Sequence, residues 1–208
     1  SLLIVIVAGL LIGFACWWFF HSAPPKSIIL TCGEKDSLYF RIAQRYAEIL
    51  ARDGVKLIIL PSAGSLENLQ RLSDASFTVD IGFVQAGMAK GHNIDNLVSL
   101  GSLSYQPLFV FHRLPREVDR LSQLAGGRLA VGREGSGTRL LAATLLALNG
   151  IESGGTTKLL AMEGERAAEA LLAGRIDAVF LTADSATSHT LRTLLQAKGI
   201  HLVNFPQA

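Results

Sequence analysis

The chain passes from a strand into a helix through the stretch Gly132-Arg133-Glu134-Gly135-Ser136-Gly137-Thr138-Arg139. Arg128 and the apolar residues 129–131 before it predict a strand, and residues 138–149 after it predict a helix that Gly150 ends. Glycines in such a turn bring backbone N–H groups to the start of a helix. There the N–H groups lack helical partners and the helix dipole is positive. The stretch therefore predicts a site for an anion.

Outward from this turn, apolar runs alternate with amphipathic helical patterns in both halves of the chain, which is typical of an α/β fold with parallel sheets. The run Val79-Asp80-Ile81-Gly82-Phe83-Val84 closes the first half, and Ile176-Asp177-Ala178-Val179-Phe180-Leu181 closes the second with a similar pattern. Each follows an amphipathic helix. We infer a duplicated architecture of two lobes, with a cleft between them that strand ends and helix starts face.

The predicted organisation has five parts. They are a transmembrane anchor at 1–20, a linker at 21–26, a first lobe at 27–112, a crossover at 113–127 and a second lobe at 128–208. Proteins with two such lobes usually return to the first lobe at the end of the chain. No segment here does so convincingly, and we therefore expect the chain to be part of a longer protein.

The anchor is predicted because residues 1–20 contain no charged side chain. Twenty helical residues span about 30 Å, the thickness of the hydrocarbon core of a bilayer. The aromatic residues 17–20 would then lie at the membrane surface. A cleaved signal peptide is the alternative, although its apolar region is usually shorter. We expect anchoring in the inner membrane, with the rest of the chain facing the periplasm or another extracytoplasmic space.

Composition and motifs argue against several classes of protein. A net charge of +2 does not favour a nucleic-acid partner, and the two cysteines and five histidines show no metal-ligand spacing. Thr138-Arg139 stands where a phosphate-binding loop requires Lys followed by Ser or Thr. Glu134 stands where a serine hydrolase motif has glycine. A two-lobed lyase or transferase similar to porphobilinogen deaminase would need a third domain or a cysteine in the cleft that carries its cofactor, and Cys32 is the only candidate for that cysteine. We predict no enzyme, no cofactor and no metal.

The predicted ligand is a small anion held at two helix starts. Arg139 can pair bidentately with a carboxylate, and Gln85 follows a strand whose end faces the cleft. Plain helix capping is an alternative role for Ser65 and Ser136, a solvated position for Arg139, and a core position for Tyr39. The complete set of candidate ligand-binding residues is Ser37, Tyr39, Ser62, Ser65, Asn68, Gln85, Ser136, Gly137, Thr138, Arg139 and Thr182.

Several of these segments, in this order, resemble the TAXI-type solute-binding subunits of tripartite ATP-independent periplasmic (TRAP) transporters. The matching pieces are Ser37-Leu38-Tyr39, residues 61–69, residues 79–85, residues 130–139 and residues 170–178. The resemblance implies a periplasmic-binding-protein-like fold of type II that closes around a small carboxylate. It also implies ligand contacts at Tyr39, Ser65, Asn68, Gln85, Ser136 and Thr138. Gly33-Glu34-Lys35-Asp36 departs from the glycine-rich first loop of that family and places charged side chains near the cleft.

The function expected from these features is capture of an amino acid, a dicarboxylate or a 2-oxoacid for the membrane subunits of a TRAP-type permease. The alternative is a membrane-anchored ligand-sensing domain of a signalling or regulatory protein.

Overall fold

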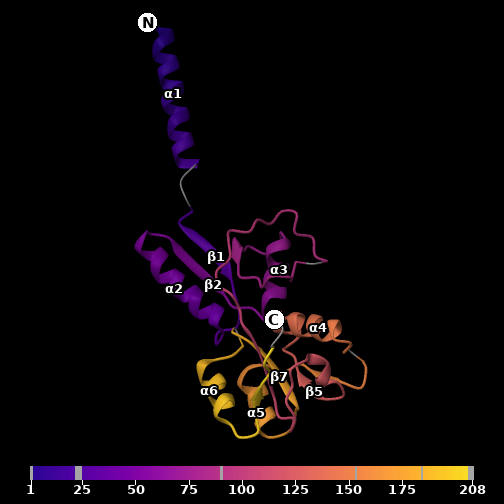
Figure 1. Cartoon of the computed structure of the whole chain (residues 1–208). Helices are drawn as coiled ribbons and strands as arrows, with labels where there is room; N and C mark the ends of the chain where they lie inside the picture. Colours follow the sequence, from indigo (N-terminus) through magenta and orange to yellow (C-terminus); the bar gives the residue numbers. More distant parts are fainter. Residues whose placement is uncertain (1, 22–24, 90, 153, 184, 206–208) are drawn as a thin grey trace.

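The computed structural model describes residues 2–21, 25–89, 91–152, 154–183 and 185–205. In it, a helix α1 (Leu2–His21) stands apart from a body built on two sheets (Figure 1). Residues 22–24 of the predicted linker lie outside the described residues.

The first sheet contains three parallel strands, β1 (Ser27–Thr31), β2 (Lys56–Leu60) and β3 (Ile81–Gly82), in the order β2-β1-β3. The six-residue run at 79–84 forms only a two-residue strand. Its Asp80 uses a side-chain oxygen, Oδ2, to accept the backbone N–H of Ile29 at 2.7 Å, which replaces a ladder bond between main chains.

Two helices accompany this sheet, and together with it they form the first lobe. Helix α2 (Leu38–Arg52) packs its apolar side against the sheet, where Ala43 joins Leu30 in the core. Helix α3 (Ser65–Ser73) follows β2 and contacts β3. Ser37 caps α2, because its Oγ accepts the N–H of Phe40 at 3.1 Å.

The second sheet has five strands in the order β6-β5-β7-β4-β8. Strands β5 (Arg128–Ala130), β6 (Lys158–Leu160) and β7 (Ala178–Thr182) are parallel. In both sheets the second strand, the first and the third lie in that order, which confirms the duplication predicted from the sequence.

One predicted strand lies in a different sheet from the one expected. Strand β4 (Leu108–His112) was placed in the first lobe, but it pairs antiparallel with β7 along its whole length, and β8 (His201–Leu202) pairs with its other edge. A short apolar run predicts a buried strand but carries no information about which neighbour will supply its hydrogen bonds. The second sheet with its helices is the second lobe.

Helices cover both faces of the second sheet. Alternate residues of a strand point to opposite faces. Val110 and Phe180 therefore pack with α4 (Gly137–Leu148) and the short 3-10 helix η1 (Leu121–Leu124). Their neighbours on the other face pack with α5 (Gly164–Leu172) and α6 (Ser188–Gln196).

The segment 113–127 was predicted to be a polar crossover between lobes. Instead, Val118, Leu121 and Leu124 are buried in the core of the second lobe. Arginines lie among these apolar residues in the sequence. The segment therefore lacks the clear apolar periodicity that predicts burial. Farther upstream, residues 97–103 form no strand, and Val98 and Leu100 are 83% and 82% exposed.

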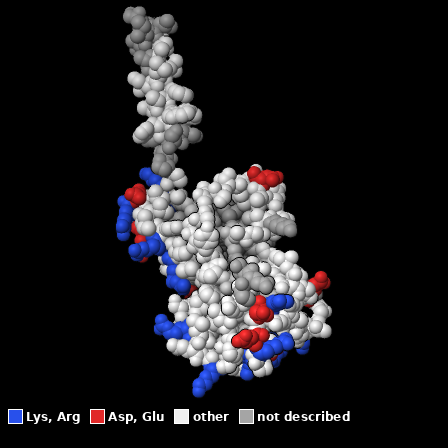
Figure 2. Space-filling model, in the orientation of Figure 1, with Lys and Arg blue, Asp and Glu red and all other residues white. Residues whose placement is uncertain are grey.

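Helix α1 forms where the anchor was predicted, and it contains no Lys, Arg, Asp or Glu, whereas these residues are interspersed over the face of the body seen in Figure 2. Large apolar side chains such as Leu10 and Phe19 are exposed on it. Among the described residues, however, no helix combines the length and apolar character that a membrane crossing requires. Anchoring of the chain in a membrane stays a prediction.

A pair of histidines lies between the last two strands of the second sheet. His112 on β4 is opposite His201 on β8, and their ring centroids are 5.4 Å apart. The side chain of His112 is buried, and its Nδ1 has no hydrogen-bond partner. Burial, and to a lesser extent the charge of His201, lowers the pKa of His112 below its ordinary value. The fold therefore favours the neutral imidazole.

This lowered pKa predicts a loss of stability in acid. The unfolded chain takes up a proton at His112 near the ordinary histidine pKa of about 6.5, where the folded chain resists it. The free energy of unfolding should therefore be constant above that pH and decrease as the pH falls through it. Urea unfolding between about pH 8 and about pH 5 measures this change.

Two variants assign the effect. His112→Phe should flatten the pH dependence, whereas His189→Asn, which changes an exposed histidine near the start of α6, should retain it. An unchanged slope in His112→Phe would mean that another group causes the acid sensitivity.

Candidate functional site

The two lobes touch where their parallel strands end. The starts of α3 in the first lobe and α4 in the second lobe meet there, and the backbone N–H of Leu66 donates to the carbonyl oxygen of Gly135 at 3.2 Å. Gly64 has a φ of 137°, a backbone conformation that other residues rarely adopt, whereas a Cβ there would make only ordinary contacts, at 3.4 Å from the Gly135 oxygen and 3.6 Å from the Cα of Ser136. The predicted meeting of helix starts is therefore present as a direct contact between backbones.

Gln85 and Gly137 form a second contact across the same boundary. Gln85 follows β3, and its backbone N–H donates to the Oγ of Ser65 at 3.0 Å. Its side chain lies against Gly137: a Cβ on that glycine would collide with the Oε1 of Gln85 and lie 2.9 Å from the Cβ of Gln85. Four of the predicted site residues, Ser65, Gln85, Ser136 and Gly137, are thus brought together.

The two serines at the helix starts have different roles. Ser136 is the N-cap of α4, with its Oγ accepting the N–H of Arg139 at 3.2 Å, as the capping alternative predicted. Ser65 is instead the first residue of α3, and Gly64 occupies the N-cap position. Only glycine readily adopts the positive φ that the close approach requires, which moves the helix start by one residue.

Other predicted residues bond within their own lobe. Asn68 is fully buried, with its Oδ1 accepting from the hydroxyl of Thr31 at 2.6 Å and its Nδ2 donating to the carbonyl of Phe83 at 2.7 Å. In the second lobe the hydroxyl oxygens of Thr138 and Thr182 are 2.8 Å apart, and both residues are buried. These groups join strand ends to helices in this conformation.

The remaining candidates of the first lobe surround the end of β1. The hydroxyl of Ser62 donates to the carbonyl of Cys32, and Ser37 caps α2. Tyr39 is buried, with its ring centroid 5.6 Å from that of Phe83, so it lies in the core as the alternative for it predicted.

Arg139 is paired within its own loop. Its Nη2 is 2.7 Å from the Oε1 of Glu134, and its Nη1 donates to the carbonyl of Gly132 at 3.4 Å. Its side chain is 24% exposed. The guanidinium is therefore at the predicted place, and its role as a carboxylate clamp stays a prediction.

Arg133, which is not among the predicted site residues, makes a contact between the lobes. It bonds to Glu163, which precedes α5 in the same lobe, and to Glu34, which follows β1 in the other lobe. Burial lowers the pKa of Arg133, but the hydrogen bonds and charges of Glu163 and Glu34 outweigh it and raise the pKa above its ordinary value. Two features of the sequence could have identified this pair. Glu34 lies in the loop that differs from the glycine-rich loop of TAXI-type subunits, and Arg133 lies in the turn at 132–139.

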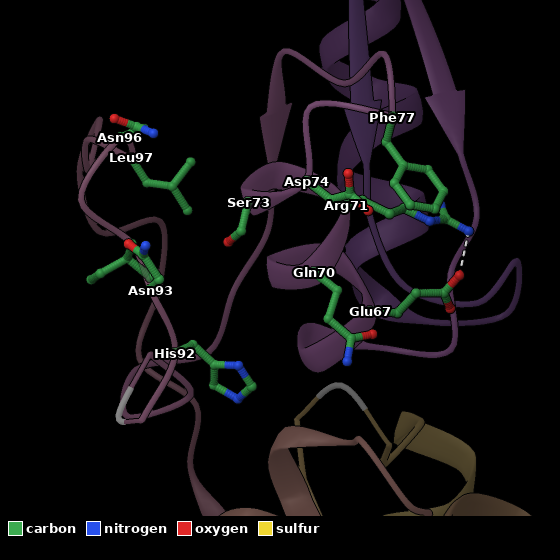
Figure 3. Close-up of a pocket in the computed structure, with 11 residues that line it drawn as sticks. Glu67, Gln70, Arg71, Ser73, Asp74, Phe77, His92, Asn93, Asn96 and Leu97 are labelled. Atoms are coloured by element: carbon green, nitrogen blue, oxygen red, sulfur yellow. Dashed lines mark hydrogen bonds and ion pairs between the residues drawn. The ribbon is translucent and has the colours of Figure 1, made fainter.

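Two hollows lie beside α3. One, of about 700 Å³, is lined by α3 and by residues up to 97, and Figure 3 shows Gln70 and His92 extending toward the same space. All of its lining residues precede β4 in the chain. The other, of about 570 Å³, adjoins Glu34 and Ser62. Within the described residues, no group of three or more His, Cys, Asp or Glu could hold a metal ion.

Comparison with known proteins gives a family and a fold. Residues 29–208 match the profile of the NMT1-like family, and no curated protein sequence matches the chain. Its structure is similar to that of the periplasmic aliphatic sulphonate-binding protein SsuA from Escherichia coli, with a TM-score of 0.56 and 17% identity over 87% of this chain and 57% of that one. The chain thus spans little more than half the length of SsuA.

Two further structures share the architecture. An ancestral arginine-binding protein bound to arginine has a TM-score of 0.57 and 16% identity, covering 86% of this chain and 79% of its own. The CcmR regulatory domain of Synechocystis PCC6803 in complex with 2-PG has a TM-score of 0.54 and 15% identity, covering 87% and 81%. At such identities the shared property is the fold, an α/β periplasmic-binding-protein-like fold with parallel and mixed sheets.

The packing of Gln85 on Gly137 predicts that no side chain is tolerated at position 137. Gly137→Ala should reduce the free energy of unfolding by about 1–3 kcal/mol, the usual cost of overpacking, because the Cβ of Gln85, unlike the end of its side chain, can move only with its backbone. Chemical denaturation measures the change.

A matched control is Gly155→Ala, since a Cβ there meets only the Glu152 oxygen at 3.5 Å; it should change stability by less than about 0.5 kcal/mol. Adding Gln85→Ala to Gly137→Ala should recover part of the loss. Equal effects of the two glycine substitutions would refute the predicted contact.

Proposed function

Since the chain belongs to the NMT1-like family and has the fold of periplasmic solute-binding proteins, we propose that it captures a small anionic solute between its two lobes. The observation that carries this proposal is the meeting of the starts of α3 and α4, where the N–H of Leu66 in α3 bonds across the boundary between the lobes.

At this boundary a hydrogen-bond acceptor, the carbonyl oxygen of Gly135, already lies at the start of α3. The N–H of Leu66 bonds to a carbonyl oxygen of the other lobe, and an oxygen of a bound anion can take that place when the lobes separate. Arg133 and Arg139 bring two guanidinium groups within the same turn. Backbone N–H groups and guanidinium groups together bind carboxylate and similar anions.

The solute we propose is an amino acid, a dicarboxylate or a 2-oxoacid. We also propose an extracytoplasmic location, delivery to a TRAP-type permease and no catalytic step of its own. The sequence resemblance to TAXI-type subunits supports the permease, and the shared order of parallel strands in both lobes supports the type II class. Similar structures are those of proteins described as binding a sulphonate, arginine or 2-PG.

A ligand-sensing domain is the second candidate. The structural similarity of this chain to the CcmR regulatory domain favours that candidate. Solute uptake into membrane vesicles that contain a TRAP-type permease separates the two. A transport subunit is required for uptake, whereas a sensing domain leaves uptake unchanged.

Ligand capture predicts a rise in melting temperature with the right solute. A ligand present at about 100 times its Kd adds about 2.7 kcal/mol of stability if it binds only the folded chain. A thermal-shift screen against amino acids, dicarboxylates, 2-oxoacids and uncharged sugars tests this prediction. A flat response to every anion would contradict the proposal.

The proposed clamp at Arg139 predicts a loss of affinity on truncation. Arg139→Ala should weaken binding of the best anion by at least about tenfold, the value of one charge-assisted hydrogen bond. Arg45→Ala, on the exposed side of α2, is the control and should leave affinity unchanged. If the two variants bind alike, Arg139 is not a clamp. Isothermal titration calorimetry gives both affinities.

A further inference from the structure

Arg133 contacts carboxylates from both lobes, but it holds them in different ways. Glu163 of its own lobe receives two bonds: the Nε of Arg133 lies 2.6 Å from Oε1, and the backbone N–H of Arg133 donates to Oε2 at 3.3 Å. Glu34 of the other lobe pairs with a single terminal nitrogen, Nη1. Glu163 therefore fixes the position of the guanidinium, while Glu34 occupies only its outer end.

Exposure separates the two carboxylates further. The side chain of Glu163 is 15% exposed and that of Glu34 is 54% exposed. Ion pairs that are open to solvent contribute little to stability and are screened by salt. Glu34 also lies on the wall of the hollow of about 570 Å³, so its carboxylate has solvent to move into. Of the two partners of Arg133, Glu34 is the one that a competing anion can replace.

The position of this pair connects it with the proposed ligand site. Arg133 lies two residues before Gly135, whose carbonyl accepts the N–H of Leu66 from the other lobe. Ser136, the N-cap of α4, donates its hydroxyl to the carbonyl of Arg133 at 2.9 Å. The backbone of Arg133 therefore belongs to the turn that starts α4, while its guanidinium holds a carboxylate of the first lobe.

We propose that Arg133 is an anion-recognising residue of the cleft and that Glu34 is its internal counter-ion, which the anionic group of the ligand displaces. This inference rests on the proposed function as a solute-binding protein. It assigns specificity to two residues outside the predicted set. The chain closes on its own carboxylate when no ligand is bound, and a ligand must offer Arg133 a better partner than Glu34.

The test compares anion affinities of four variants in the full chain. Succinate, L-glutamate, 2-oxoglutarate and sulfate serve as probes, and titration calorimetry measures their binding. Glu34→Gln should tighten anion binding by about twofold to fivefold, the value of a solvent-exposed ion pair. Arg133→Gln should weaken it by at least about tenfold. Arg133→Lys, which keeps the charge and is the milder change to the fold, should retain part of the affinity.

The control is Glu48→Gln, which removes the same charge from an exposed pair with Arg45 on α2. It should bind as the unchanged chain does. Binding by Glu34→Gln alone, with none by the parent, also supports the inference, because the internal carboxylate then blocks a working site.

Failures of this inference and of the proposed function give different results. Anion binding that is insensitive to both Glu34 and Arg133 overturns the inference and leaves the solute-binding function intact. If neither the parent chain nor Glu34→Gln binds any probe anion, the inference and the anion-binding function both fall.

Discussion

The backbone hydrogen bond from Leu66 to Gly135 is the constraint on which the arrangement of this protein depends. It brings two main chains into direct contact, where Gly64 has a positive φ that other residues rarely adopt and a Cβ on Gly137 would collide with the side chain of Gln85. The contact aligns the starts of α3 and α4 and with them the ends of the parallel strands in both sheets. A site at this boundary is therefore made of backbone groups first, and side chains such as Gln85 and Ser136 complete it.

The charged residues at the boundary form ion pairs with one another, which suits a protein with two conformations. Arg133 is held by one carboxylate of its own lobe and one of the other, so the closed arrangement needs no external anion. A ligand shifts such an equilibrium only by the difference in its affinity for the two states. An internal counter-ion that is half exposed keeps this difference available to a ligand, since it adds little to the closed state by itself.

The second lobe also contains a strand that precedes its duplicated unit in the chain. β4 precedes the β5–α4–β6–α5–β7 repeat in the chain and pairs with β7 antiparallel, and β8 adds to its far edge. This edge contains His112 and His201, so the same extension that widens the sheet buries a titratable ring. Leu121 and Leu124 of η1 pack against one face of this sheet.

Periodicity and turn residues in the sequence determined the order of elements, the duplication of the lobes and the helix starts at Ser65 and Ser136 to within a residue, because these features depend on neighbours in the chain. The turn at 132–139 was correctly predicted to join a strand to a helix at the boundary of the lobes. Only the tertiary structure decided which sheet receives β4, that Asn68 is bound inside the first lobe, and that Arg133 rather than Arg139 reaches the other lobe. These outcomes depend on hydrogen bonds and ion pairs between residues far apart in the chain, such as Glu34 and Arg133, and local spacing carries no record of which partner will lie opposite.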